Sequence, residues 1–179
     1  AISDTCRELT QEVVTRAAAA GVKVIVDINY RSRLWSASDA RDSLQPLCGL
    51  ASLVILTQSD ARTVFDLEDE PCDALTELIG VLGTSMVVMT LGSEGAAWIE
   101  DGSCQRSAAF DTEIVDRVGA GDAFAAGVIT GFLDGDLTEG VQRGLAMAAL
   151  TLGLYGDLFV AGPRDVDTIR SGTAPEVER

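Results

Sequence analysis

Short apolar runs alternate with longer stretches of mixed apolar and polar residues along most of this chain of 179 residues. A short, nearly continuous apolar run is typical of a strand buried on both faces of a parallel sheet. Apolar residues that recur every three to four positions instead predict a helix with one buried face. On these grounds we expect strands at 22–28, 53–56 and 86–91, and helices at 5–20, 59–65, 121–133 and 138–152.

Polar residues that favour helix ends mark the first boundaries. Thr5 and Glu8 have the spacing of a capping box, in which each side chain accepts a hydrogen bond from a backbone amide of the first turn. Gly21 follows the same segment and is the residue type that most readily ends a helix. Ser36 or Ser38 is expected to begin the next helix.

Proline and glycine place further boundaries. The second helix is expected to end before Pro46, because proline lacks the amide that a helix interior needs. Pro71 suits the first turn of a later helix. Asp101 and Gly102 form a dipeptide typical of a tight hairpin turn, which predicts paired strands at 96–100 and 104–110.

This alternation of strands and helices predicts one α/β domain over residues 1–179, with a mostly parallel sheet in a three-layer α/β/α arrangement. Ligands of such sheets bind beyond the carboxyl ends of the strands. Polar segments follow the predicted strands at 29–31, 57–60 and 90–95, and Asp122 opens a helix after another strand-like run. We therefore expect all four segments to meet at one edge of the sheet.

The composition is that of a globular protein, with 47% apolar and 23% charged residues. Its 28 acidic and 13 basic residues give a net charge of −15, which disfavours nucleic acid and anionic membranes as partners. The same excess fits either a bias in genomic composition or a surface adapted to salt. No apolar run approaches the roughly 18 residues of a membrane span. The absence of histidine excludes a Ser-His-Asp triad within this chain.

Four cysteines, Cys6, Cys48, Cys72 and Cys104, lie far apart and show no C-x-x-C spacing. This usage is typical of the reduced thiols of a cytosolic protein. We therefore expect four free cysteines and a cytoplasmic location.

The segment 114–127 carries the strongest chemical signal, because a Gly-Ala-Gly turn runs directly into an amphipathic helix. Glycines let backbone amides crowd together, and a helix N-terminus adds free amides and a positive dipole end, so the turn suits phosphate. Asp122 gains nothing beside a bound phosphate unless its carboxylate accepts a proton from an attacking hydroxyl. The alternative is that Asp122 only stabilises the first helical turn. A dinucleotide fingerprint is disfavoured because Phe124 stands where it needs glycine.

Four stretches resemble the ribokinase-like (PfkB) family of sugar kinases, in the family's order. The segment 114–127 resembles its C-terminal signature, and 90–96 resembles its nucleotide loop. The segments 27–35 (Asp-Ile-Asn-Tyr-Arg-Ser-Arg-Leu-Trp) and 154–157 (Leu-Tyr-Gly-Asp) resemble the 2-keto-3-deoxygluconate kinase branch. The resemblance implies an ATP- and Mg²⁺-dependent transfer of the γ-phosphate to the primary hydroxyl of 2-keto-3-deoxygluconate.

The resemblance also implies a role for each matching residue. Asp122 would be the catalytic base and would contact the substrate, and the transferring phosphoryl group would be held by the amides of Gly119, Ala120 and Gly121. The nucleotide would contact Thr90, Gly92, Ser93, Gly95 and Asn29. The sugar acid would contact Arg31, Tyr30 and Asp157, and a guanidinium such as that of Arg31 binds a carboxylate through two hydrogen bonds.

Structural alternatives accompany these roles. Residues 90–95 could be an ordinary strand-to-hairpin turn, and Arg31 a solvated loop arginine. Trp35 is expected to pack in the core rather than to stack on a sugar. Gly127 and Gly131 lie one helical turn apart and are expected to allow close packing against a neighbour.

Two positions depart from the family pattern. Arg117 replaces the usual threonine, a change that fits the 2-keto-3-deoxygluconate branch. The family's Asn-x-x-Glu, tied to a magnesium-water network, is Thr57-Gln58-Ser59-Asp60 in this chain. Asp60 would act on the metal through water, with a shorter reach than glutamate.

Members of the family are longer than this chain, so we expect the chain to be the C-terminal, nucleotide-binding half of one kinase domain. The N-terminal half, with the lid and much of the sugar pocket, would be missing, and the chain alone would be a poor catalyst. A homo-oligomer would form through that lid. The alternatives are another sugar kinase of the family, acting on fructose or ribose, and a non-catalytic nucleotide-binding or assembly module.

Overall fold

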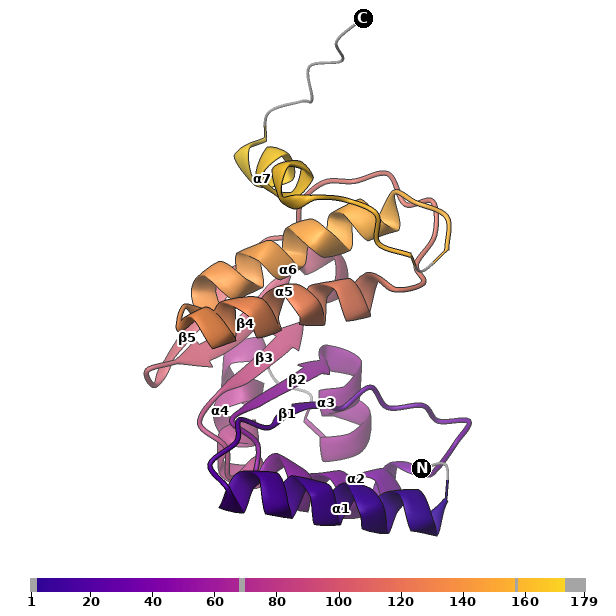
Figure 1. The fold of residues 1–179 in the computed structure, drawn as a ribbon, viewed down its shortest axis with the longest axis vertical. Coiled ribbons are helices and arrows are strands. Elements are labelled where there is room, and N and C mark those ends of the chain that lie inside the picture. The colour runs from indigo at the N-terminus through magenta and orange to yellow at the C-terminus, as the bar shows by residue number, and fades with distance from the viewer. Residues whose placement is uncertain (1–2, 68–69, 157, 173–179) are drawn as a thin grey trace, which may run out of the picture. The chain divides into compact units, whose positions relative to one another are not determined.

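A computed structural model describes residues 3–67, 70–156 and 158–172 (Figure 1). Their contacts group the chain into two compact units. Unit 1 comprises Ala1–Gly92 and Ala97–Arg106, and unit 2 comprises Ser93–Ala96 and Ser107–Arg179. No helix within the described ranges is long and apolar enough to cross a membrane.

A five-stranded sheet in the order β1-β2-β3-β4-β5 organises unit 1. Its strands are β1 (Ile25–Asp27), β2 (Leu53–Thr57), β3 (Val87–Thr90), β4 (Ala96–Glu100) and β5 (Ser103–Ser107). The first three strands pair in parallel, with Ile25 opposite Leu53 and Thr57 opposite Thr90. The predicted mostly parallel α/β sheet is therefore confirmed. The first strand is shorter than predicted, because its ladder with β2 begins only at Ile25 and leaves Val22 57% exposed.

Four helices precede β3 in unit 1: α1 (Asp4–Ala19), α2 (Ala37–Cys48), α3 (Gln58–Phe65) and α4 (Pro71–Leu82). Residues from α2, α3 and α4 pack with alternate residues of the strands in one buried cluster. Alternation follows from the two-residue period of a strand, which sends every second side chain to the same face. The cluster includes Ala40, Cys48, Val54, Leu56, Val64, Leu75, Leu78, Val87 and Met89.

Two helix boundaries differ from the prediction. The N-cap of α1 is Ser3, whose hydroxyl accepts a hydrogen bond from the Cys6 amide at 3.2 Å, so the helix begins before the expected Thr5 cap. The helix α2 begins after Ser36, one of the two expected serines, but continues through Pro46. Proline near the end of a helix removes a single hydrogen bond, and the Gly49 amide still donates to Gln45 at 3.1 Å.

The β4–β5 connection confirms the hairpin prediction. Asp101 and Gly102 have φ values of 50° and 75°, and two successive positive φ values define the turn type that best matches the twist of paired strands. The second strand of this hairpin ends at Ser107 rather than at the predicted residue 110.

The expectation of four free cysteines is wrong. Cys72, at the start of α4, forms a disulfide with Cys104 on β5. Beside it, Arg106 of β5 forms an ion pair with Glu70, the N-cap of α4. Spacing along the chain could not reveal this pair, because the fold brings α4 and β5 together across 32 residues. Since persistent disulfides are rare in the cytosol, cysteine usage no longer supports a cytoplasmic location.

Alkylation should count the thiols. Iodoacetamide is expected to modify only Cys6 in the native, unreduced protein, because Cys48 is buried and burial raises the pKa of its thiol to about 12. After mild reduction Cys72 and Cys104 should react as well. Mass spectrometry would count one modified cysteine before reduction and three after it. Cys72→Ser should lower the free energy of unfolding by about 3–4 kcal/mol, the range that a closed loop of this length gives. Modification of Cys72 and Cys104 without reductant would contradict the assignment.

Unit 2 contains α5 (Ala120–Asp134), α6 (Leu137–Leu152) and α7 (Pro163–Ser171). The helices α5 and α6 were both predicted, whereas α7 was not. No strand forms over residues 113–118 before α5, and Ile114 and Val115 are exposed, so the strand-like reading of this run is wrong.

Glycines set the contact between α5 and α6. A Cβ atom on Gly127 would lie 2.4 Å from the Gly144 nitrogen, and one on Gly131 would lie 2.2 Å from the Gly140 Cα atom. Real Cβ atoms do not come so close to backbone. The predicted packing role of Gly127 and Gly131 is therefore confirmed.

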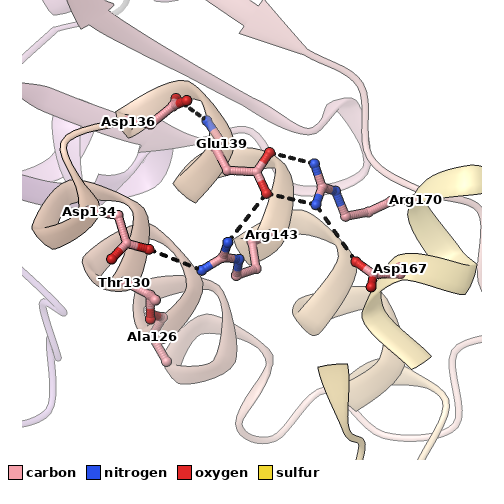
Figure 2. Close-up of polar contacts among 8 residues, drawn as sticks. All are labelled: Ala126, Thr130, Asp134, Asp136, Glu139, Arg143, Asp167 and Arg170. Atoms are coloured by element: carbon pink, nitrogen blue, oxygen red, sulfur yellow. Dashed lines mark hydrogen bonds and ion pairs between the residues drawn. The ribbon is translucent and has the colours of Figure 1, made fainter. Parts of the chain in front are cut away.

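A charged network fastens α7 to α6 (Figure 2). Both terminal nitrogens of Arg170 on α7 bind the carboxylate of Glu139 on α6, at 2.7 and 2.5 Å. Arg143 approaches the same carboxylate from α6 at 3.4 Å and also reaches Asp134 of α5 at 3.7 Å. Such two-pronged pairing fixes orientation as well as distance. Its signal in the sequence is weak because Glu139 and Arg170 are 31 residues apart.

Candidate active site

Three of the predicted polar segments share one edge of the sheet in unit 1. Thr57 and Thr90 end β2 and β3 and lie opposite each other in the parallel ladder. Residues 29–31 follow β1, which is parallel to β2. The carboxyl ends of β1, β2 and β3 therefore lie together, at the edge where α/β proteins bind ligands.

Asn29 and Arg31 line a cavity of about 600 Å³ within unit 1. Side chains from α1 and α2 complete its wall, among them Arg7 and Asp42. Arg31 is exposed and forms no ion pair with any residue of the described ranges, whereas Arg7 already binds Asp4 at 2.7 Å. The guanidinium of Arg31 is thus available to an acidic ligand.

Asn29 has an unusual backbone conformation, with a φ of 40°. Positive φ is uncommon for residues other than glycine, and asparagine is among the side chains that tolerate it best. Asn29 lines the cavity in this conformation, and so does Arg31 two residues later. An asparagine immediately after a strand was the sequence signal for this conformation.

Tyr30 and Trp35 face the core more than the cavity. Both are partly buried against the core cluster of unit 1, and the Tyr30 hydroxyl donates a hydrogen bond to the Trp35 carbonyl at 3.1 Å. Trp35 also lines part of the cavity, but Tyr30 is absent from its wall. Trp35 packs against the core as expected, but it also lines the cavity, so the preference for packing over sugar stacking stays a prediction. The Tyr30 hydroxyl ties the loop together through its bond to Trp35.

Thr57 and Asp60 form a reciprocal capping box at the start of α3. The Thr57 hydroxyl accepts from the Asp60 amide at 3.0 Å, and the Asp60 carboxylate accepts from the Thr57 amide at 3.1 Å. Asp60 is 7% exposed. One carboxylate oxygen is therefore already engaged locally, and the water-mediated metal role of Asp60 stays a prediction.

The predicted nucleotide loop follows β3 and contains a short 3₁₀ turn, Gly92–Glu94. Thr90 and Gly92 belong to unit 1, and Ser93 and Gly95 belong to unit 2. The two glycines are present for different reasons. Gly92 has a φ of 63° with open space around it, whereas a Cβ on Gly95 would lie 2.0 Å from the Ser107 carbonyl oxygen. Gly95 is thus required by close backbone packing, and Gly92 leaves its backbone accessible.

The Gly-Ala-Gly turn begins α5 in unit 2. Gly119 is the N-cap with a φ of 81°, and no side chain caps the helix. The Ala123 amide donates to the Gly119 carbonyl at 2.9 Å, but the amides of Gly119, Ala120 and Gly121 have no acceptor among the described residues. Three free amides at a positive helix end form a site for an anion.

Asp122 lies on the first turn of α5, and its side chain is exposed. It forms no hydrogen bond or ion pair with any residue in the described part of the chain. A carboxylate in this position is free to accept a proton from a ligand held by the neighbouring amides. Asp157, the other predicted acidic contact, lies outside the described residues.

The structure adds Asp116, for which the sequence analysis predicts no role. Its carboxylate accepts hydrogen bonds from the amides of Val118 at 3.2 Å and Gly156 at 3.1 Å. These bonds, that from Val118 first and that from Gly156 next, lower the pKa of the Asp116 carboxyl. Its position two residues before Val118 was an available signal, since aspartate often binds the amide two residues on.

The chain is similar to known proteins over most of its length. The family model described as pfkB family carbohydrate kinase matches residues 1–160. The chain is 34% identical over its whole length to a 2-dehydro-3-deoxygalactonokinase from Haloferax volcanii, of which it covers 57%. The chain thus spans little more than half the length of this relative.

Two solved kinase structures share the fold of this chain. A 2-dehydro-3-deoxygluconokinase from Thermotoga maritima superposes with a TM-score of 0.83 at 26% identity, over 93% of this chain and 55% of the other. An aminoimidazole riboside kinase from Salmonella enterica, in complex with its riboside and an ATP analogue, gives 0.83 at 25% identity, over 95% and 59%. With a family model that matches most of its length, and with the fold of these kinases, the chain belongs to the pfkB family of carbohydrate kinases.

Proposed function

We propose that this chain is the C-terminal, nucleotide-binding part of a kinase that transfers the γ-phosphate of ATP to the primary hydroxyl of a 2-keto-3-deoxy sugar acid, 2-keto-3-deoxygluconate. The observation that carries the proposal is the start of α5, where three free amides stand beside an unpaired carboxylate. Phosphoryl transfer depends mainly on positioning and on neutralising charge, and oriented amides do both.

In this proposal the amides of Gly119, Ala120 and Gly121 bind the transferring phosphoryl group, and Asp122 takes the proton of the attacking hydroxyl. Thr90, Gly92, Ser93, Gly95 and Asn29 contact the nucleotide. The open surroundings of Gly92 support this, because a phosphate can approach its backbone without meeting a side chain. For Gly95 the close packing of residues 107–109 already explains the glycine.

The sugar acid is proposed to bind through Arg31, with Asp157 accepting one of its hydroxyls and Tyr30 shaping the loop. An unpaired guanidinium on a cavity wall is the feature that favours an acid over a neutral sugar. Two relatives named as kinases of 2-dehydro-3-deoxy sugar acids support the same substrate class. One relative is named for the deoxygalactonate and the other for the deoxygluconate. The galactonate epimer of 2-keto-3-deoxygluconate is therefore a second candidate substrate.

The described residues offer no preformed cluster of protein ligands for magnesium. No three histidine, cysteine, aspartate or glutamate residues within those ranges are grouped to hold a metal ion. Proteins that bind Mg²⁺ with ATP commonly leave most of its coordination to phosphates and water. Asp60 would contribute through water alone, and no step of the proposed reaction depends on it.

A substrate panel tests the proposal. The complete kinase that contains this chain should consume ATP with 2-keto-3-deoxygluconate or its galactonate epimer, and much less with fructose or ribose. Turnover of fructose or ribose in preference to both acids would assign another activity of the same family. Nucleotide binding without consumption in the presence of any of these sugars would favour a non-catalytic module.

Arg31→Ala should raise the KM for the sugar acid by about 10- to 100-fold, the usual effect of losing a hydrogen-bonded charge partner. The KM for ATP should stay within about threefold, because that change removes no nucleotide contact. Arg33→Ala is the matched control, since Arg33 is also an exposed arginine of this loop but does not line the cavity. An unchanged preference for the acid over neutral sugars in Arg31→Ala would remove Arg31 from the substrate site.

A further inference from the structure

The segment that leads into the Gly-Ala-Gly turn is fastened along the end of α6. The Thr112 hydroxyl donates to the Ala149 carbonyl at 3.1 Å. The amides of Val115 and Asp116 both donate to the Leu152 carbonyl, at 2.8 and 3.2 Å. No strand forms over residues 113–118. Hydrogen bonds to the end of α6 take the place of those that a neighbouring strand would have made.

Asp116 extends this fastening beyond the end of the helix. One oxygen of its carboxylate accepts the Val118 amide, and the other accepts the amide of Gly156, 40 residues further along the chain. Gly156 lies in the loop after α6 with a φ of 82°, and its hydrogen bond to Asp116 brings this loop to the segment before α5. A single side chain therefore links the approach to α5 with the loop that follows α6.

We propose that Asp116 is a positioning residue, which fixes the direction of the amides at the start of α5 by holding Val118 and Gly156 on one carboxylate. This inference rests on the proposed function. Gly119 follows Val118 directly and carries the first of the three free amides. Rotation of the backbone at Val118 would change where those amides point, and a displacement of about 1 Å at a phosphoryl-transfer site can cost a factor of 10² in rate.

The low pKa of the Asp116 carboxyl agrees with this role, because an ionised carboxylate can accept both hydrogen bonds at neutral pH. Asp116 does not contact the reacting groups in this proposal and acts only through the backbone. The role is therefore distinct from that of Asp122.

Kinetics of the complete kinase test the proposal. Asp116→Ala should lower kcat by about 10- to 100-fold with less than a threefold change in the KM for ATP. Asp116→Asn keeps one acceptor oxygen and should recover part of that loss. Asp111→Asn is the matched control, because Asp111 is an exposed acid of the same unit that has no hydrogen-bond partner among the described residues, and it should behave as wild type.

Hydrogen exchange gives a readout that does not depend on activity. Asp116→Ala should speed amide exchange at 117–121 and at 154–156 together, while Asp111→Asn should leave both segments unchanged. A lower unfolding temperature with kcat per folded enzyme unchanged would show a merely structural residue and overturn the proposal. Unaltered exchange in Asp116→Ala would overturn it as well. Absence of kinase activity in the wild type would instead refute the proposed function, and exchange would still show whether Asp116 joins the two segments.

Discussion

Asp122→Asn should lower the kcat of the complete kinase by about 10²–10⁴-fold, the range expected for loss of a general base. Asparagine has nearly the shape of aspartate but cannot accept the proton of an attacking hydroxyl. The KM for ATP should change little, because the backbone amides that are proposed to bind phosphate remain. Steady-state kinetics with a saturating sugar acid would measure both quantities.

The fold should tolerate this change. Asp122 is exposed, and its side chain has no partner in the part of the chain that the structure describes. Asp111→Asn, a replacement of another exposed acid in unit 2, is expected to keep wild-type turnover. If Asp122→Asn retained kcat within about threefold at an unchanged unfolding temperature, Asp122 would not be the base.

The second large effect concerns stability. Gly131→Ala should lower the free energy of unfolding by about 3 kcal/mol or more, since overpacking of a well-filled contact usually costs 1–3 kcal/mol and here the opposing atoms are backbone. The new Cβ would lie 2.2 Å from the Gly140 Cα atom, so α5 and α6 would have to separate. Chemical denaturation followed by circular dichroism would measure the loss.

A glycine in another helix supplies the control. Gly80 lies in α4, is exposed, and has open space where a Cβ would be. Gly80→Ala should therefore be neutral or stabilise by about 0.5–1 kcal/mol, the ordinary helix preference for alanine. Equal effects of the two substitutions would show that the α5–α6 contact can yield and that the glycines are not required by packing.

The sequence predicted those features that depend on short stretches of chain. The three parallel strands, the Asp101–Gly102 turn and the α5–α6 pair follow from local periodicity and from residues with strong backbone preferences. The segments proposed to carry chemistry could be assigned to strand ends and a helix start, where ligands bind in this class of fold, and their roles stay predictions.

Features that depend on contacts between distant segments could not be predicted. The Cys72–Cys104 disulfide joins α4 to β5, and no spacing rule connects two single cysteines. Asp116 was read only as part of a motif, because its partner Gly156 is 40 residues away. The apolar pair Ile114 and Val115 suggested a strand, but the backbone there bonds to the end of α6 instead of to a neighbouring strand.

The contact between α5 and α6 brings backbone against backbone. Gly127 approaches the backbone of Gly144, and Gly131 approaches that of Gly140, and a backbone has no rotamer that could change to absorb a displacement. We therefore expect α5 and α6 to move together rather than to slide past each other. At each of these four positions a side chain larger than hydrogen would meet backbone of the opposing helix and force the two helices apart.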